Sequence, residues 1–190
     1  MAGKIFATSD LHFNHDKMFV WSKRGFSGVD EMNREIIKRW NQTVAPDDVV
    51  WVLGDLMLGG AQKMNEGLEL IKCLNGELHI VLGNHDTDER AKAYKTCYNV
   101  VEVVNAARFK YNGYHFDLSH YPTFTGSLEK DSLRQTLVGL YGHTHQTDNF
   151  YKDIPFMYHV GVDSHNCYPV ALDDIIVECE NKVQECKEKL

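Results

Sequence analysis

The most constraining feature of the sequence is a set of five strand-like segments that end on residues able to bind a metal or move a proton. Each segment is rich in apolar side chains, which is typical of buried strands. The segments are 4–9 before Asp10 and His12, 49–53 before Asp55, 78–82 before Asn84, 114–119 before His120, and 137–141 before His143 and His145. Since ligands bind beyond the carboxyl ends of parallel strands, we expect these polar side chains to meet.

At the third of these strand ends, the block Gly83-Asn84-His85-Asp86 has three consecutive residues that can bind a metal or transfer a proton. Glycine after a strand lets the backbone turn and approach another group closely. Taken alone, the block is a polar loop, and any single histidine at a strand end is better interpreted as structural. The combination of seven such residues at five strand ends is what favours a metal site.

The order of the elements predicts the fold class. Helical patterns at 30–40, 62–73 and 88–98 alternate with the first strands. The second half is mostly strands, with the hairpin signal Asn112-Gly113 between 100–110 and 114–119. We also expect a strand at 157–162, a polar loop with a short helix at 121–136 and a helix within 172–190. This order predicts an α/β (α+β) fold with helices outside and more antiparallel strands in its second half.

Composition narrows the class of protein. A chain of 190 residues with 43% hydrophobic and 25% charged residues suits a single globular domain, 1–190. The net charge of −7 argues against long duplex nucleic acid as a partner. Five cysteines without a CxxC pair, no signal peptide and no membrane-spanning run lead us to expect a cytoplasmic protein.

The expected cluster has the donor types of a two-metal site. Such a site needs a carboxylate that bridges both ions, and oxygen or imidazole ligands for each. The candidates are Asp10, His12, Asp55, Asn84, His120, His143 and His145. With Asp55 shared, they supply about four ligands per ion. The set contains no thiol, and its mixed nitrogen and oxygen donors suit two divalent ions of Mn, Fe, Zn or Ni, with Mn preferred, better than Mg.

These motifs resemble the five signature blocks of the calcineurin-like metallophosphoesterases. The matching residues are Asp10-x-His12, Gly54-Asp55, Gly83-Asn84-His85-Asp86, His120 and Gly142-His143-x-His145, in the family's order. The stretches Asp10 to His15, Arg24-Gly25-Phe26 and Gly161-Val162-Asp163 resemble small single-domain members from bacteria and phages. The resemblance implies a four-layer αββα sandwich of two mixed β-sheets flanked by helices.

The resemblance also implies an assignment of roles. One metal would be held by Asp10, His12, Asp55 and His145, and the other by Asp55, Asn84, His120 and His143. A hydroxide bridging the two ions would attack a phosphate monoester or diester. His85 would act as general acid, with Asp86 holding its ring and keeping it protonated.

Three further residues are candidates for binding substrate. His15 shares a loop with the first ligands, Arg24 offers a bidentate cation for phosphate oxygens, and His165 follows the strand end at Gly161-Val162-Asp163. Each also has a plain structural interpretation. The expected substrate is a small phosphate ester, a nucleotide or a short oligonucleotide, and a homodimer would fit this kind of protein.

Two alternatives to the phosphoesterase interpretation remain at this point. One is a binding scaffold for a protein partner, in which the metals are weak or vestigial. Such relatives usually lose ligands, and this sequence has lost none of the seven. The other is a two-metal hydrolase that cleaves a bond other than a phosphate ester, which the Gly83–Asp86 block argues against.

Overall fold

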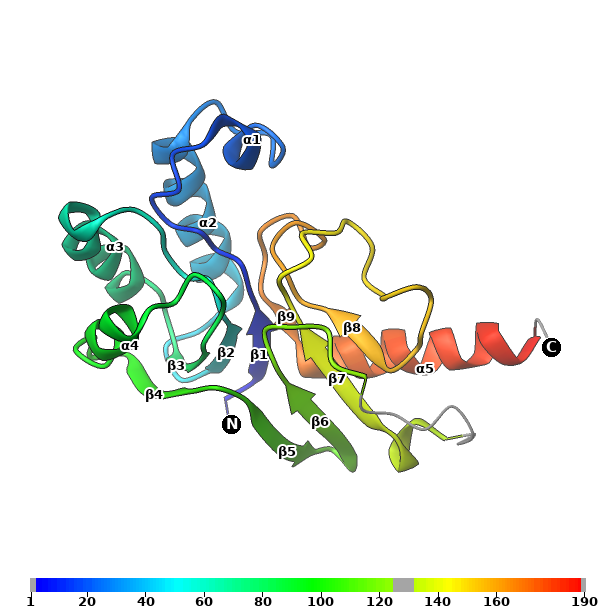
Figure 1. Cartoon of the computed structure of the whole chain (residues 1–190). Helices are drawn as coiled ribbons and strands as arrows, with labels where there is room; N and C mark the ends of the chain where they lie inside the picture. The colour runs from blue at the N-terminus through cyan, green and yellow to red at the C-terminus, as the bar shows by residue number, and fades with distance from the viewer. Residues whose placement is uncertain (1–2, 125–131, 189–190) are drawn as a thin grey trace.

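The protein folds as two mixed β-sheets with helices packed against them (Figure 1). The computed structural model describes residues 3–124 and 132–188. The first sheet has the order β4-β3-β2-β1-β9, and its strands are β4 (Val100–Val104), β3 (Glu77–Val81), β2 (Val49–Leu53), β1 (Ile5–Thr8) and β9 (Val170–Ala171). Strands β1 to β4 are parallel, and β9 pairs antiparallel to β1.

The second sheet has the order β5-β6-β7-β8. Its strands are β5 (Ala107–Tyr111), β6 (Tyr114–Leu118), β7 (Leu137–Tyr141) and β8 (Met157–His159). The pair β5 and β6 is the hairpin that Asn112-Gly113 predicted, with both turn residues at positive φ. Strands β6, β7 and β8 are parallel, so their carboxyl ends share one edge of the sheet.

Strand alternation divides the core into two clusters. On β2, Val50 and Val52 pack with the cluster that includes α2 (Val29–Thr43), α3 (Ala61–Lys72) and α4 (Asp88–Tyr94). Trp51 and Leu53 point the other way, into the cluster shared with the second sheet and α5 (Leu172–Glu188). The central strand β2 is therefore covered on both faces, as its apolar sequence predicted.

The structure confirms the predicted class of two mixed sheets with helices, and it corrects several boundaries. The expected strand at 100–110 is two strands, β4 and β5, which belong to different sheets. The helix expected over 88–98 ends at Tyr94, and the strand expected over 157–162 ends at His159. Of the expected loop and short helix at 121–136, residues 125–131 lie outside the described residues, and a 3-10 turn covers Leu133–Gln135.

Two short elements had no signal in the sequence. The four-residue helix α1 (Met18–Trp21) has no counterpart among the elements expected from the sequence. Strand β9 has two residues, paired to Phe6 and Ala7. Within the described residues, no helix is both long and apolar enough to cross a bilayer. That residues 1–190 form one domain stays a prediction.

The two faces of β6 give a test of this packing. Phe116 is 0% exposed and contacts Phe109, whereas its neighbour His115 is exposed on the opposite face. We expect Phe116→Ala to lower the free energy of unfolding by about 3–5 kcal/mol, because it leaves a cavity between the sheets. The control His115→Ala should stay within about 0.5 kcal/mol of wild type. Urea denaturation followed by circular dichroism measures both, and equal effects of the two variants would contradict the assigned faces.

Candidate metal centre

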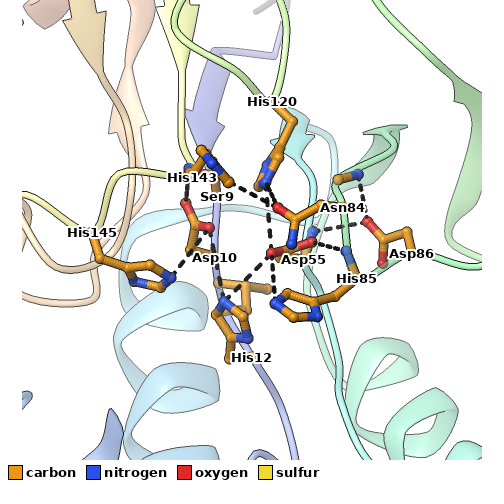
Figure 2. Close-up of polar contacts among 12 residues, drawn as sticks. Ser9, Asp10, His12, Asp55, Asn84, His85, Asp86, His120, His143 and His145 are labelled. Carbon is orange, nitrogen blue, oxygen red and sulfur yellow. Dashed lines mark hydrogen bonds and ion pairs between the residues drawn. The ribbon is translucent and has the colours of Figure 1, made fainter. Parts of the chain in front are cut away.

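The loops that follow β1, β2, β3, β6 and β7 bring the seven predicted ligand residues to one place (Figure 2). Asp10 and His12 come from the loop after β1, Asp55 from the loop after β2, and Asn84 from the turn after β3. The remaining three are His120 after β6, and His143 and His145 after β7. The structure therefore assembles the cluster that the strand ends predicted.

The first group of donors is spaced for a shared cation. His12 Nε2 lies 3.8 Å from Asp10 Oδ1 and 3.6 Å from Asp55 Oδ2, and His145 Nε2 lies 3.8 Å from Asp10 Oδ1. These distances are too long for hydrogen bonds. Two ligand atoms that each lie ~2.1 Å from one tetrahedral ion are roughly 3.4 Å apart. The separation is therefore close to that of ligands around one ion.

The second group surrounds the side-chain oxygen of Asn84. Asn84 Oδ1 lies 2.9 Å from His120 Nε2 and 2.8 Å from His143 Nδ1. His120 Nε2 also lies 3.6 Å from Asp55 Oδ2. Ligand atoms of Asp10, Asp55 and His120 fall within 4.8 Å of one another, as do those of Asp10, His12 and His145. Asp10 is therefore a member of both of these triplets. Asp55 Oδ2 lies near one histidine of each triplet, His12 and His120.

Hydrogen bonds at the far side of two rings fix histidine tautomers that suit a metal. His120 Nδ1 lies 2.7 Å from the Leu53 carbonyl oxygen, which can only accept a hydrogen bond. His145 Nδ1 lies 2.6 Å from Asp163 Oδ2. In a neutral ring, a proton on Nδ1 leaves a lone pair on Nε2. In His145, that lone pair faces Asp10 Oδ1, whereas Nε2 of His120 faces the side-chain oxygens of Asn84 and Asp55.

Burial makes the centre costly without a cation. Asp10, His12, Asp55 and His120 are all buried. Asp10 Oδ1 and both ring nitrogens of His12 have no hydrogen-bond partner among the described residues. Burial raises the pKa of Asp10, and burial together with the nearby Arg24 charge lowers the pKa of His12 to about 2. Buried oxygen and nitrogen atoms without hydrogen-bond partners are suited to bind a divalent cation.

The backbone is strained where the ligands leave the strands. Five of the seven residues have φ in the left-handed region, namely Asp10 (58°), His12 (52°), Asp55 (56°), His143 (66°) and His145 (48°). This conformation is uncommon for residues other than glycine and costs about 1 kcal/mol each. Outliers of this kind cluster at functional sites, where the surrounding structure holds them.

Two glycines make room for the carboxylates. A Cβ at Gly83 would meet the Asp55 carboxylate, and a Cβ at Gly142 would meet Ser9 and Asp10. The sequence predicted that Gly83 allows a close approach, and the structure identifies the approaching group as Asp55. Ser9, which the sequence did not single out, donates its hydroxyl to Asp10 Oδ2 at 2.6 Å.

His85 lies at the open side of the centre. Its side chain is 44% exposed, and its Nε2 lies 3.9 Å from Asp55 Oδ2. Its backbone amide donates to Asp55 Oδ1 at 2.9 Å, and the Arg90 guanidinium donates to its carbonyl oxygen. The main chain that carries this histidine is therefore anchored, while its ring lies beside His12 and Asp55 (Figure 2).

Asp86 has a different role from the one expected. Asp86 Oδ2 accepts hydrogen bonds of 2.8 Å from the amides of Gly83 and Asp55, and Oδ1 accepts one of 2.6 Å from the Tyr94 hydroxyl. No bond between Asp86 and the His85 ring occurs within the part of the chain that the structure describes. The turn after β3 directs the carboxylate back at the backbone, so Asp86 joins two ligand loops and does not hold the ring.

The three residues expected to bind substrate have different positions in the structure. His15 lies beside the centre, with its ring 5.2 Å from that of His12. Arg24 is not free for a phosphate, because its side chain is 2% exposed and donates to Asp163 and to the carbonyl oxygens of Asp10 and Leu11. His165 is turned away, bonded to the His159 carbonyl and stacked on Tyr158.

Asp163 is a site residue to which the sequence reasoning gave no role. It accepts from His145 Nδ1 and, at 3.0 Å, from Arg24 Nε. Burial by itself would raise the pKa of Asp163, but the hydrogen bond from His145 and the Arg24 charge outweigh it and hold the pKa below its ordinary value. The sequence feature that could have identified it was its position directly after the strand expected over 157–162.

Two mixed sheets whose strand ends gather Asp and His side chains define a candidate metal centre. The chain belongs to the calcineurin-like phosphoesterase superfamily, whose domain matches residues 4–162. It is 36% identical to an uncharacterised protein of Methanocaldococcus jannaschii over 91% of this chain and 89% of that protein. It is 29% identical to the Gene 66 protein of Mycobacterium phage D29 over 95% and 98% of the two chains.

A solved structure shows the same fold. A protein of unknown function from Aquifex aeolicus superposes with a TM-score of 0.67 at 24% identity, covering 91% of this chain and 97% of that one. The match over residues 4–162 establishes the family, and the solved structure establishes the fold. The ligand assignment within the centre stays a prediction.

The contact between Asp163 and His145 yields a prediction about metal affinity. We expect Asp163→Asn to weaken Mn²⁺ binding by about 10–100-fold, because it removes the charge that orients His145 and pairs with Arg24. Calorimetric titration of the metal-free protein with Mn²⁺ measures this. The control Asp148→Asn makes the same charge change at an exposed position of the loop between β7 and β8. Equal affinities for the two variants would show that Asp163 does not position a ligand.

Proposed function

We propose that this protein is a phosphoesterase that uses two divalent metal ions to hydrolyse a phosphate monoester or diester. The observation that carries the proposal is the convergence of seven donor side chains, of which Asp10 and His12 have buried atoms without a hydrogen-bond partner among the described residues. Membership of the phosphoesterase superfamily supports the same chemistry.

The donor set divides between two ions as follows. Asp10, His12, Asp55 and His145 would hold one, and Asp55, Asn84, His120 and His143 the other. Mn²⁺ is the proposed ion, and Fe, Zn and Ni suit the same donors. When bound, the two cations supply an activated water and positive charge for the phosphoryl oxygens. Asp55 Oδ2, 3.6 Å from both His12 and His120, is the proposed bridging ligand.

His85 is the proposed general acid. Its ring is half-exposed at the edge of the centre and is close to Asp55, so it can reach an ester oxygen on the open side. In the hydrolysis, a water oxygen bonds to phosphorus and the phosphorus–oxygen bond to the alcohol breaks. The leaving oxygen takes the proton of His85, which is replaced by a proton from the attacking water by way of solvent.

The proposed substrate is a small phosphate ester, a nucleotide or a short oligonucleotide. Long duplex nucleic acid would be repelled by a chain of net charge −7. A scaffold that binds a protein partner is the alternative, and the presence of all seven ligand residues argues against it. A cytoplasmic location and a homodimer remain expectations from the sequence.

Loss of the central carboxylate tests the proposal as a whole. We expect the wild-type protein with Mn²⁺ to hydrolyse p-nitrophenyl phosphate or its bis ester, and Asp55→Asn to lose metal and turnover together. Metal content after dialysis and release of p-nitrophenol are the two measurements. Asp47→Asn, an exposed aspartate before β2, is the matched control. Absence of turnover with Mn, Ni, Zn and Mg across mono-, di- and cyclic esters would remove the enzymatic proposal.

The proton donor is tested separately. We expect His85→Asn to keep its metal and to lose about 10²–10⁴-fold in rate on alkyl esters, whose alkoxides need a proton to leave. The loss should be much smaller on p-nitrophenyl esters, whose phenolate leaves unaided. Comparing kcat for both ester types in the two proteins measures the difference. Full turnover of an alkyl ester by the variant would show that another group supplies the proton.

A further inference from the structure

A cavity of about 440 Å³ opens directly beside the metal centre. His12, His85 and His145 form the wall on the side of the centre. His15 and the α1 residues Phe19 and Val20 also line it. Its volume is that of a pocket for a small organic ligand, which is larger than a phosphate group needs.

The wall formed by α1 is apolar and exposed. Phe19 is 69% exposed, and its ring meets that of His15 edge to face at 6.0 Å. Exposed aromatic side chains beside a cavity can mark a binding site, because the exposed face of the ring is available for a ligand to stack on.

The α1 segment is held in place relative to the centre. Arg24, three residues after the helix, donates to the carbonyl oxygens of Asp10 and Leu11 and to Asp163. The amide of Phe26 donates to the Trp21 carbonyl at 2.9 Å, which closes the turn after α1. Phe19 is therefore presented by a segment that is tied to the backbone of the metal-binding loop.

The charges around the cavity are compatible with a ligand that carries a phosphate. Among the described residues that line it, Asp163 is the one carboxylate, and it is bonded to Arg24 and His145. Lys23 lies at the wall and donates to the His145 carbonyl at 3.3 Å. The cavity thus presents no unbalanced negative charge to the phosphate end of a ligand.

The position of His85 identifies which part of the substrate enters. If His85 protonates the leaving oxygen, that oxygen must lie at the cavity wall that His85 forms, and the alcohol to which it belongs extends into the cavity. We infer that the preferred leaving group is an alcohol that carries a flat aromatic ring, aryl or nucleobase, which stacks on Phe19. This inference rests on the proposed function for the role of His85.

Binding of two phosphonates tests the inference without turnover. Propylphosphonate and 3-phenylpropylphosphonate share a phosphoryl group and an uncleavable carbon–phosphorus bond, and they differ only in the ring. With the Mn²⁺-loaded protein, calorimetry should show the phenyl compound binding roughly tenfold more tightly, as expected for one stacked ring. Phe19→Ala should abolish most of this preference.

Met18 provides a matched control. It is adjacent to Phe19 on α1, equally exposed at 69%, and does not line the cavity. Met18→Ala should keep the preference for the phenyl compound. Phe19→Tyr should also keep it, because tyrosine retains an aromatic ring. Equal affinities of the wild-type protein for the two phosphonates would overturn the inference, and so would a preference that survives Phe19→Ala.

The outcomes separate this inference from the proposed function. Turnover of phosphate esters without a ring preference would leave the phosphoesterase and remove the ring site. A ring preference lost in Phe19→Ala, in a protein that hydrolyses no ester, would retain the ring site and remove the enzymatic role.

Discussion

The structure depends on keeping two carboxylates, Asp10 and Asp55, together in a buried place. One oxygen of each is satisfied by the protein, since Asp10 Oδ2 accepts from Ser9 and from the His143 amide, and Asp55 Oδ1 accepts from the His85 amide. The other oxygen of each faces histidine nitrogens at 3.6–3.9 Å. Burying two like charges is costly unless they are compensated. Divalent cations are the compensation that these donors suit.

The fold supplies the carboxylates by placing parallel strands side by side. Strands β1, β2 and β3 end at one edge of the first sheet, and β6 and β7 bring the second sheet's loops to the same place (Figure 1). The left-handed backbone at five of the predicted ligand residues shows that strand geometry alone does not direct their side chains. Packing of both core clusters has to hold these loops in conformations that they would not adopt in isolation.

A second layer of interactions links the candidate metal centre to its surroundings. Asp86 joins the loops after β2 and β3 through two backbone amides. Asp163 and Arg24 connect His145 to the backbone of Asp10 and Leu11. Through Arg24, the same contacts fix the segment that carries α1. The contacts of Asp163 and Arg24 therefore position both His145 and the segment that lines the neighbouring cavity.

The sequence by itself determined the strands that end on Asp, His and Asn, their order, and the need for glycine at position 83. These features are local, because apolar runs, turn residues and donor types can be read within a few positions. Only the tertiary structure decided where the other polar side chains near the site point. Asp86 and Arg24 bond to backbone groups distant in sequence, and His165 turns toward Tyr158. The elements α1 and β9 are too short to form without neighbours, so their stability comes from contacts that no local pattern encodes.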